Sequence, residues 1–282
     1  HTLEGYTVAK ETATGVDTYA GLFGYIAAGG TVKNLNVENV AVDGYSERSS
    51  GSKGGGHYGA IAGISSGILS DCHVLSGTVQ GEALLDTHIG GVVGYIFLTG
   101  SVVKNCTNAA SVSGIAGRCV SHGGIVGSVN NGVLYGCSNS GSVDGVNKNT
   151  GSYANGVRGY VFLGGIAGVS CSVIVNCSNS GPVAEGSWIY GSVGSAGSGS
   201  VVGYLHNGSD VSTDATGDDS LLIDKDAVSF TDEDLVGYYS AVIGCTGAGS
   251  KIGFLQNDAG NGKVTVAVTS DVTWRALSGN SP

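Results

Sequence analysis

The sequence predicts an all-β repeat solenoid, with a right-handed parallel β-helix built from short coils as the preferred form. Three observations predict it: Gly accounts for 52 of the 282 residues, charged residues for only 12%, and one short motif recurs along the chain. So much glycine disfavours long helices. The hydrophobic fraction of 41% argues against disorder, which needs low hydrophobicity and high charge. A β-prism or sandwich-like stack of strands is the alternative.

The first block of the repeat is a pentapeptide of two small residues, two apolar residues and a glycine. Five full copies and a partial sixth occupy residues 20–24, 59–63, 90–94, 123–127, 164–168 and, in part, 199–203. Short apolar runs broken by glycine favour stacked β-strands over helices. A single coil cannot bury its apolar face, whereas five stacked coils can.

Two further blocks complete each unit. The second block is a corner that precedes or contains a Leu or Cys, at residues 33–36, 70–73, 104–107, 135–138 and 175–178. The third block joins a Val to a closing Gly, at residues 42–44, 79–81, 112–114, 143–145 and 183–186. Each unit spans 23 to 25 residues, which fits three strands of about five residues with tight turns. Gly and Asn suit the corners because both tolerate positive φ.

Between the units the chain varies in length and composition. The variable segments are residues 45–58, 82–89, 115–122, 146–163 and 187–198. A constant core with variable inserts is typical of a solenoid, and we expect the inserts to emerge at one corner and line one side of the stack.

Four cysteines occupy one column of the repeat, where the first unit has Leu35: Cys72, Cys106, Cys137 and Cys177. A position that accepts either Leu or Cys is buried. Side chains in register point in parallel, which suits a disulfide poorly, so we expect a ladder of free thiols. The other cysteines, Cys119, Cys171 and Cys245, are expected outside this column.

Two histidines are predicted to stack on adjacent rungs. His57 and His88 each lie six residues before the last Gly of their pentapeptide, whereas His122 lies only five before its own. A shift of one residue turns a strand side chain to the opposite face, so His122 cannot join the pair. We therefore expect a two-histidine surface pair rather than a metal site.

The motifs Gly-Gly-Ile-Val-Gly, Asn-Cys-Ser-Asn and Ser-Gly-Ser-Val-x-Gly resemble the GLUG-motif repeat family over about residues 1–203. The resemblance implies a secreted or cell-surface bacterial protein of adhesin-like type, and it carries no shared catalytic residues. Residues 250–282 resemble the start of a BACON-type β-sandwich, a module common in secreted proteins of gut Bacteroidetes. There, residues 263–269 alternate strictly, which predicts a half-buried strand. Residues 204–249 are then expected to form an acidic end cap and connector.

Acidic residues concentrate in the predicted connector. The stretch from 206 to 235 carries nine carboxylates against one Lys, about −8 of the formal net charge of −10. Ca²⁺ prefers several oxygen ligands, which makes Asp214, Asp218 and Asp219 weak calcium candidates, although the spacing matches no EF-hand. A solvated cap that blocks end-to-end stacking is the alternative. No other cofactor is expected.

The inserts supply the candidate binding residues. Six aromatic residues and one arginine in them could contact a ligand: Tyr45, Tyr58, Tyr153, Tyr160, Trp188, Tyr190 and Arg158. Aromatic residues on a rigid scaffold suit sugar stacking or protein contact. We expect a non-enzymatic adhesion or glycan-binding module of a larger secreted bacterial protein, with a host or dietary glycan or a surface protein as partner. The expected location is extracellular, at the bacterial cell surface.

Other functions are less well supported by the sequence. A rigid structural spacer is one alternative, and a polysaccharide-acting β-helix enzyme is another. Asp43 and Asp144 share a column but lie three rungs apart, roughly 14 Å, which is too far for a glycosidase pair. Gln80 and Ser113 occupy the rungs between, so solvated turn residues are the simpler interpretation. The acidic balance disfavours nucleic acid, and no apolar run approaches the roughly 18 residues of a membrane span.

Overall fold

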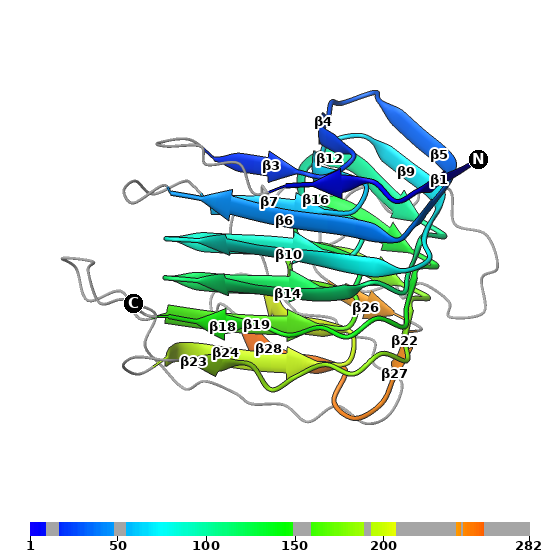
Figure 1. Cartoon of the computed structure of the whole chain (residues 1–282). Helices are drawn as coiled ribbons and strands as arrows, with labels where there is room; N and C mark the ends of the chain where they lie inside the picture. Colours follow the sequence, from blue (N-terminus) through cyan, green and yellow to red (C-terminus); the bar gives the residue numbers. More distant parts are fainter. Residues whose placement is uncertain are drawn as a thin grey trace.

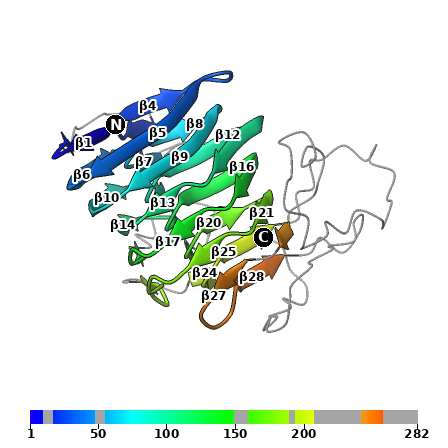
Figure 2. The ribbon, with the colours of Figure 1, turned by 90° about the vertical axis from the view of Figure 1, so that its right-hand side faces the viewer.

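The fold is a β-solenoid of about five turns, seen from two sides in Figures 1 and 2. The computed structural model describes residues 1–9, 17–47, 55–148, 159–188, 193–206, 241–243 and 245–256. These residues form strands, turns and bends without a helix, and their strands pair in parallel. The predicted fold class, an all-β parallel solenoid, is confirmed.

Three parallel sheets make the walls of the solenoid, and we name them A, B and C. Sheet B contains β2 (Thr7–Val8), β6 (Val40–Ser46), β10 (Gly77–Ala83), β14 (Ser111–Ala116), β18 (Val146–Asn147) and β23 (Ser187–Trp188). Sheet C contains β3 (Thr18–Ala20), β7 (Gly55–Gly59), β11 (Asp86–Gly90), β15 (Cys119–Gly123), β19 (Gly159–Gly164) and β24 (Val193–Gly199). In Figure 1 the strands of sheet B cross the front of the molecule.

Sheet A is the largest sheet, because each turn contributes more than one of its strands. Its members are β1 (Thr2–Glu4), β4 (Phe23–Ile26), β5 (Thr31–Glu38), β8 (Ala62–Ser65), β9 (Ile68–Val74), β12 (Val93–Lys104), β13 (Thr107–Asn108), β16 (Val126–Tyr135), β17 (Ser138–Asn139), β20 (Ala167–Ser170), β21 (Val173–Val175), β22 (Ser178–Asn179), β25 (Val202–His206), β26 (Ala241–Ile243), β27 (Thr246–Gly247) and β28 (Ile252–Gln256). One turn therefore runs from sheet C through sheet A to sheet B.

Sheet C is the part of the fold that the sequence analysis missed. Its strands β7, β11, β15, β19 and β24 cover the ends of the segments that were predicted to be variable inserts and the first residue of each following pentapeptide. They nevertheless pair with one another from turn to turn. The variable segments are shorter than predicted: they are the connections from sheet B to sheet C, which differ greatly in length. The prediction that they share one corner of the solenoid is confirmed by this topology.

The glycine that closes each pentapeptide brings sheet A onto the backbone of sheet C. A Cβ on Gly94 would lie 2.4 Å from the Tyr58 amide nitrogen, and one on Gly127 would lie 2.5 Å from that of Ile89. Real Cβ atoms essentially never approach backbone so closely. The closing glycine of the pentapeptide therefore allows close contact between sheets A and C, in addition to the bend that the pentapeptide makes.

The corner before the cysteine column has the predicted backbone. Its residue has positive φ in five successive turns: Asn34, Asp71, Asn105, Gly136 and Asn176, with φ between 50° and 61°. The cysteines that follow are buried and free, which confirms the predicted ladder. Cys245 was predicted to lie outside the column, and this is wrong. Thr246 pairs with Ser178, and the Cys177 amide donates to the Cys245 sulfur at 3.3 Å.

A buried asparagine ladder runs beside the cysteines and was not foreseen. The Asn108 amide donates to Asn139 Oδ1, and the Asn139 amide donates to Asn179 Oδ1, both at 2.8 Å. Each asparagine also closes its own turn: Asn139 donates to the Gly141 carbonyl at 2.8 Å and accepts from the Gly141 amide at 3.2 Å. The ladder thus satisfies buried polar groups of the corner along the solenoid axis.

The solenoid extends beyond residue 203, where the sequence analysis ended it. β26 pairs with β21, β27 with β22, and β28 with β25. The segments 241–243 and 245–256 are therefore solenoid strands and turns, which corrects the predicted boundaries of the connector and of the BACON-like segment. The sequence analysis did not detect this last copy of the repeat for two reasons. Its pentapeptide, residues 249–253, contains a Lys, and 34 residues separate β25 from β26. The strand predicted at 263–269 lies outside the described residues.

Candidate functional site

The predicted aromatic site divides among different parts of the molecule. Tyr45 is half-buried on the outer face of β6, whereas Tyr160 lies on the face of β19 that points away from sheet B and contacts Phe162 at 6.0 Å between ring centroids. These two residues therefore do not form one surface. Trp188 lies in β23, paired with Asn147. The candidates Tyr153, Arg158, Tyr190, Asp214, Asp218 and Asp219 lie outside the described residues.

Tyr58 is an interior residue, which corrects its assignment as a ligand-binding side chain. It is fully buried, and its ring presses against the backbone of Gly44 and Gly81 on sheet B. A Cβ on either glycine would lie 2.2 Å from a ring carbon of Tyr58. The alternation of the strand explains the error, because His57, one residue earlier, takes the other face of β7.

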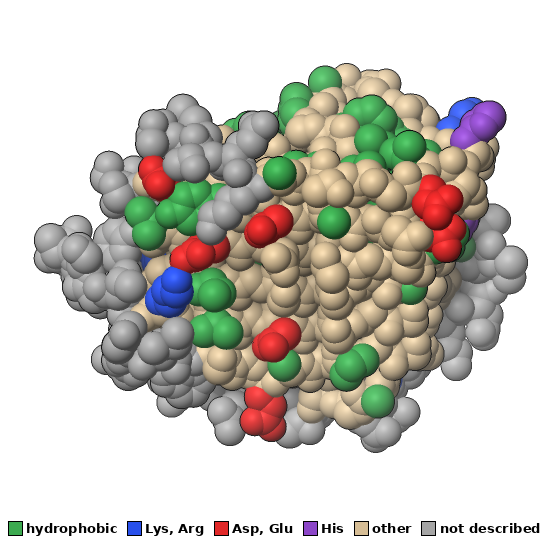
Figure 3. All heavy atoms as spheres, viewed as in Figure 1, with side chains coloured by type: hydrophobic (Ala, Val, Ile, Leu, Met, Phe, Trp, Pro, Cys, Tyr) green, Lys and Arg blue, Asp and Glu red, His purple; other side chains and the backbone are tan. Residues whose placement is uncertain are grey.

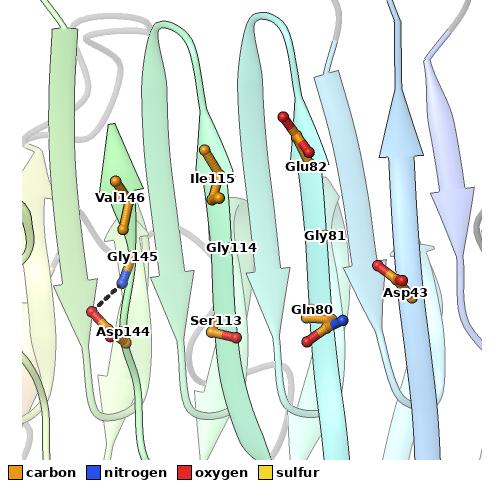
Figure 4. Close-up of a pocket in the computed structure, with 10 residues that line it drawn as sticks. All are labelled: Asp43, Gln80, Gly81, Glu82, Ser113, Gly114, Ile115, Asp144, Gly145 and Val146. Atoms are coloured by element: carbon orange, nitrogen blue, oxygen red, sulfur yellow. Dashed lines mark hydrogen bonds between the residues drawn. The ribbon is translucent and has the colours of Figure 1, made fainter. Parts of the chain in front are cut away.

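The outer face of sheet B carries the candidate site, shown in Figure 4. A shallow hollow of about 420 Å³ lies over β6, β10, β14 and the start of β18. Two rows of outward side chains border it: Asp43, Gln80, Ser113 and Asp144 in one row, and Glu82, Ile115 and Val146 in the other. We call this feature the sheet B hollow. The first row was predicted from the sequence, but as turn residues; Asp43, Gln80 and Ser113 lie within strands.

Glycines form the floor of the sheet B hollow between the two rows. Gly81, Gly114 and Gly145 follow one another on successive turns. Core side chains fill the space beneath them: a Cβ on Gly114 would lie 2.4 Å from Ile89 Cδ1, and one on Gly145 would lie 2.6 Å from Val120 Cγ1. The floor is therefore bare backbone, and side chains of sheet C pack directly beneath it.

The charge on this face is predominantly acidic, and Figure 3 shows its red side chains spread apart. Glu82 pairs with Lys148, and Asp144 Oδ1 accepts a hydrogen bond from the Gly145 amide at 2.7 Å. The register keeps Asp43 and Asp144 three rungs apart, roughly 14 Å at the usual strand spacing. This arrangement can offer several separate hydrogen-bonding groups to one elongated molecule.

The predicted stacking of His57 and His88 occurs on the face of sheet C that points away from sheet B, but the expected surface pair is wrong, because His57 is buried. The rings of His57 and His88 stack with centroids 4.9 Å apart and planes 7° apart. His122 lies on the other face, as predicted, where Nδ1 donates to the Asp144 carbonyl and Nε2 contacts the Thr87 hydroxyl. Burial lowers the pKa of His57 and His88, and lowers the pKa of His122 to about 4.

Metal and thiol chemistry find little support in the described part of the chain. There, no three His, Cys, Asp or Glu side chains are grouped so that they could hold a metal ion. Cys119 and Cys171 lie outside the cysteine column and are half-buried. Burial raises the pKa of both thiols, that of Cys171 to about 11, so they remain protonated and poorly nucleophilic at neutral pH.

In comparisons with known proteins, no family model matches the chain, and no curated protein or solved structure matches it either. The GLUG and BACON resemblances therefore stay predictions. Within the described residues, no helix has the length and apolar character needed to cross a membrane.

Proposed function

We propose that this chain is a non-enzymatic binding module and that its ligand is an extended glycan lying across the sheet B hollow. One observation carries the proposal: four polar side chains, Asp43, Gln80, Ser113 and Asp144, stand in register on successive turns beside a hollow of about 420 Å³. Rigid strands hold them, as a preformed site requires.

The chemistry of the hollow suits a polyhydroxylated polymer. Parallel strands repeat about every 4.8 Å, so the row offers hydrogen-bonding groups at regular intervals along the solenoid axis. Carboxylates accept hydrogen bonds from sugar hydroxyls, and the Gln80 amide can both donate and accept. Ile115 and Val146 in the second row, with Tyr45 on the first of these turns, offer apolar surface to the faces of sugar rings.

The same geometry argues for binding over catalysis. Glycoside hydrolysis needs two carboxyl groups within about 10 Å on either side of the scissile bond. Asp144 is too far from Asp43, and Glu82, which is nearer, is engaged by Lys148. If the chain is the secreted or surface protein that the GLUG resemblance implies, the ligand is a host or dietary glycan outside the cell. Adhesion through a surface protein is the competing form of the proposal.

A glycan-array screen of the purified chain, run with calcium and with chelator, tests this function. We expect specific hits that the double variant Gln80→Ala/Ser113→Ala abolishes and that chelator leaves unchanged. Tyr160→Ala is the matched control, because Tyr160 faces away from sheet B. A blank array would contradict glycan binding and favour a spacer or a protein adhesin. Loss of binding in Tyr160→Ala alone would move the site to the corner between sheets B and C.

A further inference from the structure

Sheet C is a middle layer, with sheet B against one face and strands of sheet A against the other. On the face toward sheet A, five residues form one column: Tyr19, His57, His88, Ser121 and Phe162. Tyr95, from β12 of sheet A, lies over the two histidines, with ring centroids 5.2 Å from His57 and 5.3 Å from His88. The imidazoles are thus part of the contact between two layers.

The two rings are packed as neutral aromatic groups. His57 is only 8% exposed, and the Nδ1 atoms of both His57 and His88 are buried without a hydrogen-bond partner. A second proton on either ring would place a charge in a contact that offers Nδ1 no acceptor. Charging both rings would also set two cations 4.9 Å apart.

A second contact between the same two sheets shows that a phenyl ring can take the place of an imidazole in this column. Phe162 occupies the histidine column three turns after His57, and its ring stacks on Tyr204 of β25 at 4.6 Å and 20°. Tyr204 in turn shares the strand column of Tyr95. The histidine pair performs the same packing but can also take up protons.

Two carboxylates lie near the histidine pair, and both are engaged by other groups. Asp86, on the same strand as His88, is bound by Arg118 through two hydrogen bonds. Asp17, just before β3, accepts a hydrogen bond from the Gly55 amide at 3.2 Å. Among the described residues, the phenol rings of Tyr19 and Tyr95 also contact the pair.

We propose that His57 and His88 form an acid-sensitive latch between sheets C and A. While both imidazoles are neutral they stack on Tyr95 and hold β7 and β11 against β12. Acidification charges the rings, and the contact opens locally while the rest of the solenoid stays paired. Burial lowers the pKa of both rings, so the latch stays closed at neutral pH and opens only on acidification.

Hydrogen exchange measured by mass spectrometry at pH 7.5 and pH 5, corrected for the intrinsic rate at each pH, tests the latch. We expect protection in β7, β11 and β12 to fall by about tenfold or more at pH 5, relative to β6 and β10 of sheet B. An equal loss in all five strands would contradict a local latch and indicate general acid unfolding.

The double variant His57→Phe/His88→Phe separates protonation from packing, since phenylalanine already serves at position 162. Its protection at pH 5 should match that at pH 7.5, whereas the control His73→Gln, on the sheet A wall, should lose protection as the parent chain does. If the double variant does not fold, the ring titration of the parent chain by NMR decides. Ionisation of both rings near the ordinary histidine value of about 6.5 would overturn the proposal.

Discussion

Sheets B and C run in register through the same turns, yet their residues face different demands. Sheet C is covered on both faces, by sheet B on one side and by sheet A on the other. Among the described residues, sheet B is covered on one face only, and its outer face carries the polar row from Asp43 to Asp144. Residues of sheet C are therefore constrained by packing on both faces, whereas the outer residues of sheet B are constrained by packing on one face only.

This difference separates two kinds of experiment. A substitution in the contact between sheets C and A should change the free energy of unfolding. A substitution on the outer face of sheet B should change binding and leave stability almost unaltered. The predictions below test this division, beginning with the largest expected effect.

Gly127→Ala should have the largest effect. The added Cβ would lie 2.5 Å from the Gly94 carbonyl oxygen and from the Ile89 amide nitrogen, and backbone cannot move aside cheaply. We expect a loss of about 4 kcal/mol or more in the free energy of unfolding, measured by denaturant titration.

Gly24→Ala is the matched control, because Gly24 closes the first pentapeptide and, among the described residues, its strand β4 pairs on one side only, with β8. A Cβ there would meet Tyr19 at 3.7 Å or more, which is ordinary contact. We expect a change within about 0.5 kcal/mol. Equal losses in the two variants would show that the pentapeptide glycine serves the bend alone and not the contact between layers.

Asn139→Ala should rank second. Asn139 is 2% exposed and sits in the middle of the ladder, where it bonds to Asn108, Asn179 and both backbone groups of Gly141. Alanine leaves these buried groups without partners, so we expect a loss of about 3 kcal/mol by thermal or chemical unfolding. Asn179→Ala should cost less, since Asn179 lacks the onward asparagine bond recorded for Asn139. A neutral Asn139→Ala would show that the ladder contributes no stability.

Local chemistry explains which features of the fold could be predicted from the sequence. The corners follow from residues that tolerate positive φ, and the cysteine column follows from a position that accepts either Leu or Cys. The histidine pair follows from counting residues to a fixed glycine. Each of these predictions requires only the sequence of one turn and the nearly constant length of the repeat unit.

Features that depend on contacts between layers could not be predicted in the same way. The strands of sheet C vary at most positions: Gly55–Gly59 and Asp86–Gly90 share only a histidine and the glycine at their end. The connections before these strands differ in length, so the strands do not recur at a fixed spacing that an alignment of the repeats could detect. The burial of Tyr58 depends on which face of β7 meets sheet B, which only the three-layer arrangement decides. The sheet B hollow likewise depends on glycines whose partners lie in another sheet.

Acid should weaken the interior of sheet C through His122. The Asp144 carbonyl can only accept, so Nδ1 carries the proton and Nε2 accepts from Thr87. The pKa of His122 is about 4 in the folded chain and about 6.5 when unfolded, so the unfolded chain takes up the proton first as pH falls. Stability is complete above pH 6.5 and declines toward pH 4.

We expect His122 alone to remove about 2 kcal/mol from the free energy of unfolding between pH 7.5 and pH 5. The measurement compares the pH dependence of His122→Gln with that of the parent chain, so that the constant cost of the substitution cancels. Identical pH dependence in the two proteins would mean that His122 is not held neutral by burial.

The smallest expected effects concern two serines, one on sheet C and one on sheet B. Ser121 on sheet C is fully buried and donates to the Gly127 carbonyl at 2.7 Å, whereas Ser113 is half-buried on the outer face of sheet B. Ser121→Ala leaves that carbonyl without its donor and should cost about 1 kcal/mol. Ser113→Ala should change the unfolding free energy by less than about 0.5 kcal/mol. A clear loss of stability in Ser113→Ala would mean that the outer row is structural, and the argument for a ligand in the sheet B hollow would lose its basis.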